Sequence, residues 1–274
     1  MSQVDSQVDS QVDSQVDIVR DGHCAHLVLR RAQRRNALDR ALVDDLYAAA
    51  AEVEHDPDVH CVVVRGDGPA FCAGIDAGTL VELATPAGLR DIRGAFVRAF
   101  DRLQAMAKPT VAQVHGAAIG AGFELALACD LRVVAADATM GLPETRMGVV
   151  PDVGACSRLT ALVGAGRAKE LIMTSAMIDG VRAGELGIAN RVAAADGLAE
   201  ATGVLVGELL ACSPSANGLV KGIIDHAAMP AQAAVSDAEL VAQLSCIHTP
   251  EFRAAAEAFR SAPASNGRPA PVRG

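Results

Sequence analysis

Hydrophobic positions along the chain follow two spacings in turn, one typical of strands and one typical of helices. Short runs of valine and other apolar residues predict buried strands, and longer stretches with apolar residues three and four apart predict helices between them. Because strands that alternate with helices usually pair in parallel, the pattern predicts an α/β fold. The predicted strands are 23–30, 59–68, 110–116 and 131–138, and the predicted helices are 36–56, 88–107 and 123–130.

The ends of the chain differ in composition from its middle. Residues 2–17 are four copies of SQVD, and this polar, low-complexity repeat predicts a disordered leader over 1–17. After about residue 195 the strand signal stops and four helical patterns follow. We therefore expect a core over 18–197, a C-terminal helical region over 198–262 and a flexible Pro/Gly-rich tail over 263–274.

Composition excludes several classes of function. A net charge of −9 and an almost complete lack of aromatic residues, with no Trp and one Tyr, argue against a nucleic-acid binder. The seven cysteines form no C-x-x-C pair, which predicts reduced thiols and a cytoplasmic protein. No apolar run approaches the ~20 residues that cross a bilayer, so we expect no membrane association.

Five arginines nevertheless crowd into one short stretch, LRRAQRRNALDR. The guanidinium group suits phosphate geometry, so this stretch is a candidate phosphate clamp. A solvated turn is the alternative interpretation. The arginines are Arg30, Arg31, Arg34, Arg35 and Arg40.

The most informative segment is GAAIGAGFELALACD, residues 116–130. Gly120 and Gly122 free the backbone, and the N–H of Ala121 lies at the start of the predicted helix, where the helix dipole is positive. Such an amide suits a developing oxyanion. Glycine used only for close helix packing is the alternative. The spacing does not match a dinucleotide-binding G-x-G-x-x-G motif.

The FCAGID loop offers a second backbone donor. It follows a predicted buried strand and precedes a helix, so the N–H of Ala73 can point into a cleft and Gly74 allows close approach. Asp76 is a candidate N-cap for the helix. An ordinary strand-to-helix turn is the competing interpretation.

Three acidic residues in apolar surroundings are candidates for proton transfer. Glu124 lies among Leu and Ala on a predicted helix, Glu144 follows a proline in an apolar loop, and Asp152 comes eight residues later. A lone acid there is costly to bury unless it is paired or functional. The structural alternatives are a helix-dipole role for Glu124, an ion pair with Arg146 for Glu144 and a helix cap for Asp152. No metal-binding or serine-nucleophile motif is present.

Together these segments resemble the crotonase superfamily, the enoyl-CoA hydratase/isomerase family. The matching motifs are RRNALD, AFCAGID, KPTVAQVHGAAIGAGFELALACD, MGLPETRMGVVPDVG and VGAGRAKELIMT, in the family's order and spacing, and the similarity covers about 18–262. The resemblance implies a crotonase-like spiral of ββα repeats followed by a C-terminal helical trimerisation region. It also implies a homotrimer or a dimer of trimers.

The resemblance also implies roles for individual residues. Ala73 and Ala121 match the two amides of the oxyanion hole, and Glu124 and Glu144 match the two catalytic glutamates of the hydratases. Arg34 and Arg35 lie where relatives approach the CoA phosphates, and Lys221 lies in a helix that resembles the one near the CoA nucleotide. The other expected substrate contacts are Ala37, Gly74, Ile75, Asp76 and Gly122. No metal or separate cofactor is implied, because coenzyme A enters as part of the thioester substrate.

Three functions follow from the resemblance. The first is an enoyl-CoA hydratase that adds water to a trans-2-enoyl-CoA in fatty acid metabolism. The second is a Δ3,5-Δ2,4-dienoyl-CoA isomerase that uses Glu144 and Asp152, since such isomerases resemble this chain in carrying a third acid at Asp152. They usually also have Asp where this chain has Glu124, so the motif evidence is divided. The third is an acyl-CoA-binding protein with little turnover.

Overall fold

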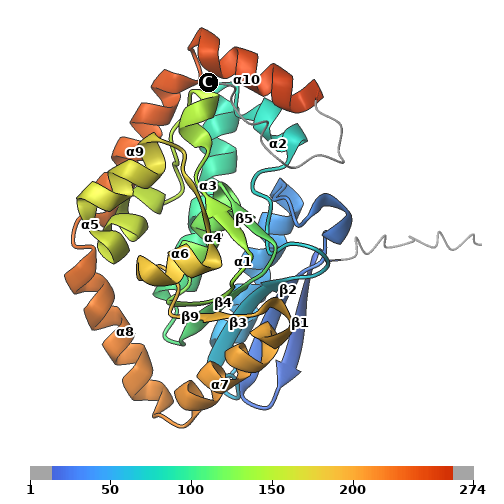
Figure 1. The fold of residues 1–274 in the computed structure, drawn as a ribbon, viewed down its shortest axis with the longest axis vertical. Coiled ribbons are helices and arrows are strands. Elements are labelled where there is room, and N and C mark those ends of the chain that lie inside the picture. Colours follow the sequence, from blue (N-terminus) through green and yellow to red (C-terminus); the bar gives the residue numbers. More distant parts are fainter. Residues whose placement is uncertain (1–13, 262–274) are drawn as a thin grey trace, which may run out of the picture.

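A six-stranded sheet forms the centre of the molecule in the computed structural model, which describes residues 14–261 (Figure 1). The first two strands are antiparallel and every later pairing is parallel. The predicted α/β fold is confirmed. In spatial order the strands are β1 (Val16–Asp21), β2 (Cys24–Leu29), β3 (Cys61–Gly66), β4 (Thr110–Val114), β6 (Leu131–Ala135) and β9 (Arg191–Ala193).

Helices cover this sheet and explain its apolar strands. α1 (Arg40–His55) packs on β1, β2 and α3 (Pro86–Ala105), whereas α7 (Leu198–Leu210) packs on β3, β4, β6 and β9. A parallel strand covered on both faces is apolar throughout rather than alternating. The three consecutive valines of β3, Val62 to Val64, are accordingly fully buried.

A second, three-stranded sheet was not predicted. It consists of β5 (Ala117–Ile119), β7 (Thr139–Gly141) and β8 (Met177–Asp179). Each strand has only three residues, which is too short for a two-residue period to be visible in the sequence. Its place in the fold matters because β5 leads directly into α4 (Ala121–Ala128).

Helix α4 is enclosed by protein along its length. Every residue from Gly122 to Ala128 is buried, and all of them except Glu124 are apolar or glycine. Gly122 is needed there, because a side-chain carbon on it would lie 2.9 Å from Cβ of Cys72. At the other end of the helix, the guanidinium of fully buried Arg132 donates to the carbonyls of Cys129 (2.7 Å) and Ala126 (3.3 Å).

The C-terminal helices differ in what they contact. α7 packs on the large sheet and so belongs spatially to the core, although the sequence boundary was placed at 198. α9 packs on α5 and α3, and α10 packs on α2 and η2. The remaining elements are η1 (Ala32–Arg34), α2 (Ala77–Glu82), η2 (Glu144–Met147), α5 (Ala155–Met173), α6 (Gly180–Glu185), η3 (Ala195–Gly197), α8 (Pro214–Ala228), α9 (Gln232–Cys246) and α10 (Pro250–Ser261).

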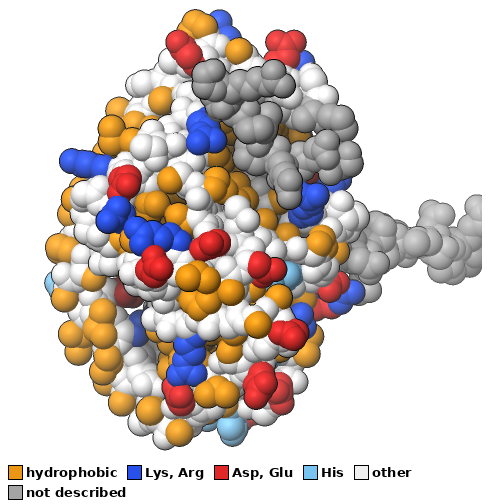
Figure 2. Space-filling model, viewed as in Figure 1, with side chains coloured by type: hydrophobic (Ala, Val, Ile, Leu, Met, Phe, Trp, Pro, Cys, Tyr) orange, Lys and Arg blue, Asp and Glu red, His pale blue; other side chains and the backbone are white. Residues whose placement is uncertain are grey.

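Helix α8 has no buried residue. Apolar side chains gather along the edge of the molecule where Figure 1 places this helix (Figure 2). They include Leu219, Val220, Ile223 and Ile224, which are 52–70% exposed. Within residues 14–261 no single helix is long and apolar enough to span a bilayer. The segments of α7 and α8 reach that length only when taken together, and the chain bends by 102° between them.

The predicted leader extends too far. Its last residues, Val16 and Asp17, form the start of β1, where Val16 pairs with Leu29 and is buried. Val16 and Ile18 are two residues apart, which is the spacing of apolar positions on one face of a strand. The rest of the leader, 1–13, and the tail lie outside the described residues.

Candidate active site

The predicted oxyanion and acidic residues line one cavity of 120 Å³. Its wall is formed by the FCAGID loop, the start of α4, η2, the 149–153 segment and parts of α3, α9 and α10. Most of the lining is apolar, with a few convergent polar groups, as in many ligand sites. The predicted residues brought together are Ala73, Ala121, Glu124, Glu144 and Asp152.

The backbone of Ala121 meets the oxyanion prediction, whereas that of Ala73 differs from it. Among the described residues the N–H of Ala121 has no acceptor, and Gly120, with φ 53°, starts the helix at that point. The N–H of Ala73 donates to the carbonyl of Arg35 at 2.9 Å. The expectation of two free amides is therefore corrected to one, since Arg35 holds the other.

The two turns nevertheless approach each other closely. Gly74 has φ 99°, and a side-chain carbon on it would lie 2.6 Å from the carbonyl oxygen of Ile119 and 3.9 Å from N of Ala121. Only glycine adopts this conformation in so little space. Ile75 follows in a bridge with Leu38 and also lines the cavity.

Glu124 is held by the start of α5. Its Oε1 accepts the N–H groups of Val153 (3.1 Å) and Ala155 (3.2 Å), and the residue is 2% exposed. Burial raises the pKa of this carboxyl well above its ordinary value, and the charge of Glu144 raises it further. The sequence pattern alone would have allowed a simple helix-dipole acid on the surface.

Glu144 begins η2 directly after Pro143 and reaches the start of α4. A side-chain carbon on Gly120 would lie 2.7 Å from its Oε1, so only a glycine leaves room for this carboxyl. Its Oε2 is buried without a hydrogen-bond partner, and no described ion pair joins it to Arg146. Burial, aided by the charge of Asp152, raises the pKa of Glu144 to about 8.

Asp152 lies on the loop before α5 and lines the same cavity. Its Oδ2 is also buried without a hydrogen-bond partner. Burial raises the pKa of Asp152 to about 7, and the nearby Arg93 opposes that rise. Because Glu144 and Asp152 ionise near neutral pH, both can exchange protons under ordinary conditions.

Sequence reasoning missed two charged residues, Arg93 on α3 and Glu239 on α9. Glu239 accepts the N–H groups of Gly154 (3.1 Å) and Cys156 (3.2 Å), which alternate with the two held by Glu124. A signal existed, because Ser236, Glu239 and Gln243 share one helical face that is turned inward. Polar residues at helical spacing are usually assigned to solvent, which is why this face was overlooked.

The arginine-rich stretch is largely occupied by internal ion pairs. Arg31 pairs with Asp39 and Asp76 at 3.1 Å each, and Asp76 also caps α2 through the N–H of Gly78, as predicted. The carboxylate that was expected to contact substrate is thus used within the fold. The nearby carbonyl of Ala37 accepts from Arg31 at 2.6 Å.

Arg34 and Arg35 are the exceptions in this stretch. Arg30 and Arg40, like Arg31, have carboxylate partners, whereas neither Arg34 nor Arg35 forms an ion pair with a described residue. Arg34 is exposed and Arg35 is half-buried. The role of both arginines in binding phosphate stays a prediction.

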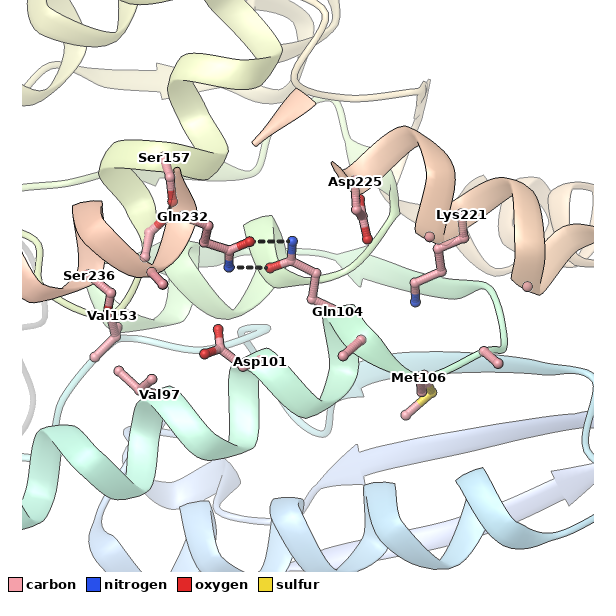
Figure 3. A pocket seen from close by; sticks show the side chains of 16 residues that line it. Val97, Asp101, Gln104, Met106, Val153, Ser157, Lys221, Asp225, Gln232 and Ser236 are labelled. Atoms are coloured by element: carbon pink, nitrogen blue, oxygen red, sulfur yellow. Dashed lines mark hydrogen bonds between the residues drawn. The ribbon is translucent and has the colours of Figure 1, made fainter. Parts of the chain in front are cut away.

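Lys221 is not brought to the candidate site. Its ammonium, 8% exposed, pairs with Asp130 at 2.9 Å and donates to the carbonyls of Leu103 and Lys108. It lines a separate cavity of 550 Å³ between α3, α8 and α9, where a pair of hydrogen bonds joins the side chains of Gln104 and Gln232 (Figure 3). Lys221 thus lies apart from the cavity that contains the acids, and its contact with substrate stays a prediction.

Comparisons with known proteins agree with the geometry. The family profile described as enoyl-CoA hydratase/isomerase matches residues 20–262. The short-chain-enoyl-CoA hydratase of Clostridium acetobutylicum is 32% identical over 76% of this chain and 79% of its own length. The mitochondrial Δ3,5-Δ2,4-dienoyl-CoA isomerase of Dictyostelium discoideum is 30% identical over 61% of each chain.

A solved structure extends the similarity to three dimensions. A protein of Thermobifida fusca YX, assigned as an enoyl-CoA hydratase and solved in complex with acetoacetyl-CoA, superposes with a TM-score of 0.71. The two are 32% identical, and the match covers 85% of this chain and 95% of the other.

Proposed function

The chain belongs to the enoyl-CoA hydratase/isomerase family, and on that premise we propose that it hydrates the 2,3 double bond of a trans-2-enoyl-CoA. The observation that carries this proposal is the convergence of Glu124 and Glu144 on a cavity that also contains the free amide of Ala121. That arrangement suits water addition beside a thioester carbonyl.

The amide of Ala121 acts on the thioester oxygen. As water attacks the β-carbon, negative charge moves onto this oxygen, and the N–H of Ala121 donates to it most strongly in the transition state. Loss of one such donor typically costs about 3 kcal/mol of barrier.

The two glutamates move the protons. One carboxylate accepts a proton from the water whose oxygen bonds to the β-carbon, and the other carboxyl delivers a proton to the α-carbon. In a dry cavity two like charges are costly, so the pair retains a shared proton that suits this exchange. The raised pKa of both groups supports that reading.

The cavity favours a short acyl group. Its 120 Å³ is small against the roughly 300–1,000 Å³ of ordinary ligand pockets. Arg34 and Arg35, which have no described ion-pair partners, are suited to the phosphates of coenzyme A at the other end of the thioester. The apolar face of α8 is suited to another copy of the chain, which supports a homotrimer or a dimer of trimers.

Glu144→Gln tests the proposal. We expect turnover of a four-carbon trans-2-enoyl-CoA to fall by roughly 10²–10⁴, because acid–base help is lost, while binding largely survives. Glu170→Gln, an exposed acid on α5, is the matched control and should leave turnover unchanged. Near-normal hydration by Glu144→Gln contradicts the assignment, and tight acyl-CoA binding without wild-type turnover favours a binding protein.

Double-bond isomerisation is the second candidate, favoured by the unpartnered Oδ2 of Asp152 beside Glu144 in one cavity. Here Asp152 and Glu144 shuttle protons along a 3,5-dienoyl-CoA to give the conjugated 2,4-dienoyl product. Absorbance of that product is the measurement. Asp152→Asn should abolish isomerisation and spare hydration. If isomerisation continues unchanged in this variant, Asp152 takes no part in the reaction.

A further inference from the structure

Arg93 is a buried cation in the wall of the candidate site. Its side chain is 9% exposed, and it extends from α3 into the lining of the cavity that contains the acids. Nη2 donates to the carbonyl oxygen (2.7 Å) and to Oγ (2.9 Å) of Ser236 on α9. Nε is buried and has no hydrogen-bond partner among the described residues. Nη2 thus anchors the guanidinium to α9, and the buried Nε donor is unused.

Two carboxylates compete for this cation. Oδ2 of Asp152 lies 3.8 Å from Nε, and Oε2 of Glu239 lies 3.8 Å from Nη2. Glu239 already accepts two backbone N–H groups, which stabilise its charge, whereas Oδ2 of Asp152 accepts none. Asp152 therefore depends on Arg93 more than Glu239 does.

The other charged groups facing Asp152 are all acidic. They come from three elements, with Glu124 on α4, Glu144 on η2 and Glu239 on α9. Each of these disfavours a negative charge on Asp152 when it is itself ionised, and burial disfavours that charge as well. Arg93 is the one cation among the described groups around this carboxyl that opposes them.

We propose that Arg93 is a positioning residue that keeps Asp152 ionised and turned into the cavity, so that Asp152 accepts a proton from substrate instead of donating one. The inference rests on the second candidate function, double-bond isomerisation, and names the group that keeps Asp152 able to take part in it. It follows from the unused Nε, the unpartnered Oδ2 and the absence of any other described cation on that side.

The first test does not require turnover. The infrared band of protonated carboxyl groups is titrated with pH, and the contribution of Asp152 is isolated by subtracting the Asp152→Asn spectrum. In Arg93→Gln we expect the Asp152 midpoint to rise by about one pH unit or more, because an opposite charge at this range is lost. Arg93→Lys should restore most of the wild-type midpoint. Arg98→Gln, an exposed position on the same helix, is the matched control.

The second test is the pH profile of dienoyl-CoA isomerisation. Below its midpoint, each unit of rise lowers the ionised fraction of Asp152 about tenfold, so Arg93→Gln should lose about tenfold in kcat and recover at alkaline pH. Circular dichroism establishes that the variant is folded, and Arg93→Lys provides a second, charge-retaining variant. An unchanged infrared midpoint in Arg93→Gln overturns the role of Arg93. Absence of wild-type isomerisation together with a shifted midpoint instead refutes the isomerase function alone.

Discussion

Replacing Gly122 with alanine tests how tightly the start of α4 is packed against the FCAGID loop. The new methyl carbon would lie 2.9 Å from Cβ of Cys72, about 0.6–1.1 Å inside the optimal carbon–carbon separation, and still closer to the Cys72 carbonyl oxygen. That carbonyl cannot move freely, because it accepts the N–H of Ile119 at 3.1 Å. The added atom must therefore displace backbone.

The net loss of stability combines overpacking, a weakened backbone hydrogen bond and a gain in helix propensity. Overpacking of a dense interior costs about 1–3 kcal/mol, and weakening of one backbone hydrogen bond adds about 1 kcal/mol. The better helix propensity of alanine returns up to about 1 kcal/mol. We expect a net loss of about 2 kcal/mol, which at 2–4 °C per kcal/mol lowers Tm by roughly 4–8 °C. Turnover should fall by about 100-fold if the amide of Ala121 shifts by 1 Å.

Urea unfolding, thermal unfolding and enoyl-CoA turnover measure these effects. Gly207→Ala on α7 is the matched control, because a methyl group there meets no atom within 4 Å. It should raise stability by up to about 1 kcal/mol and leave turnover unchanged. If Gly122→Ala unfolds at the wild-type midpoint with full activity, the packing argument is wrong.

Three further predictions concern charge and surface. Folding raises the pKa of Glu144 to about 8 and the pKa of Asp152 to about 7. The contribution of these groups to stability is therefore complete below about pH 4 and is lost as the pH rises through 7–8. The midpoint of urea unfolding should be lower at about pH 9 than at about pH 6, and Glu144→Gln should flatten this dependence. Lys221→Met leaves the half-buried carboxylate of Asp130 without its cation and should destabilise by up to about 3–5 kcal/mol, and a loss below about 1 kcal/mol in chemical unfolding would contradict a stabilising role for this ion pair. Ile223→Asp on α8 should convert an oligomer into monomers in light scattering, and an unchanged mass excludes this face as the interface.

The sequence was sufficient for elements long enough to show a period. Helix α3 and strand β3 were predicted within a few residues because their apolar positions repeat over many turns or form an unbroken valine run. The three-residue strands β5 and β7 offered no such repeat. They form because their backbones pair with each other beside α4, and this pairing is a property of the assembled fold.

The candidate site divides in a similar way. Glu124 and Glu144 could be predicted because an acid in an apolar stretch needs a reason to be there. The hydrogen bond between Ala73 and the carbonyl of Arg35 could not, since it joins two loops whose meeting depends on tertiary structure. Glu239 was hidden for another reason, because its helical face has the polarity of a solvent-exposed surface but is buried.

Arg132 connects the C-terminal end of α4 with the candidate site at the other end of that helix. Its permanent positive charge sits where the carbonyls of α4 converge, and the opposite end of that helix presents the amide of Ala121. Because the guanidinium holds the C-terminal carbonyls of α4, the N-terminal end of the helix has little freedom to reorient. The barrier to reaction would then depend on preorganisation maintained a full helix length away from the reacting carbons.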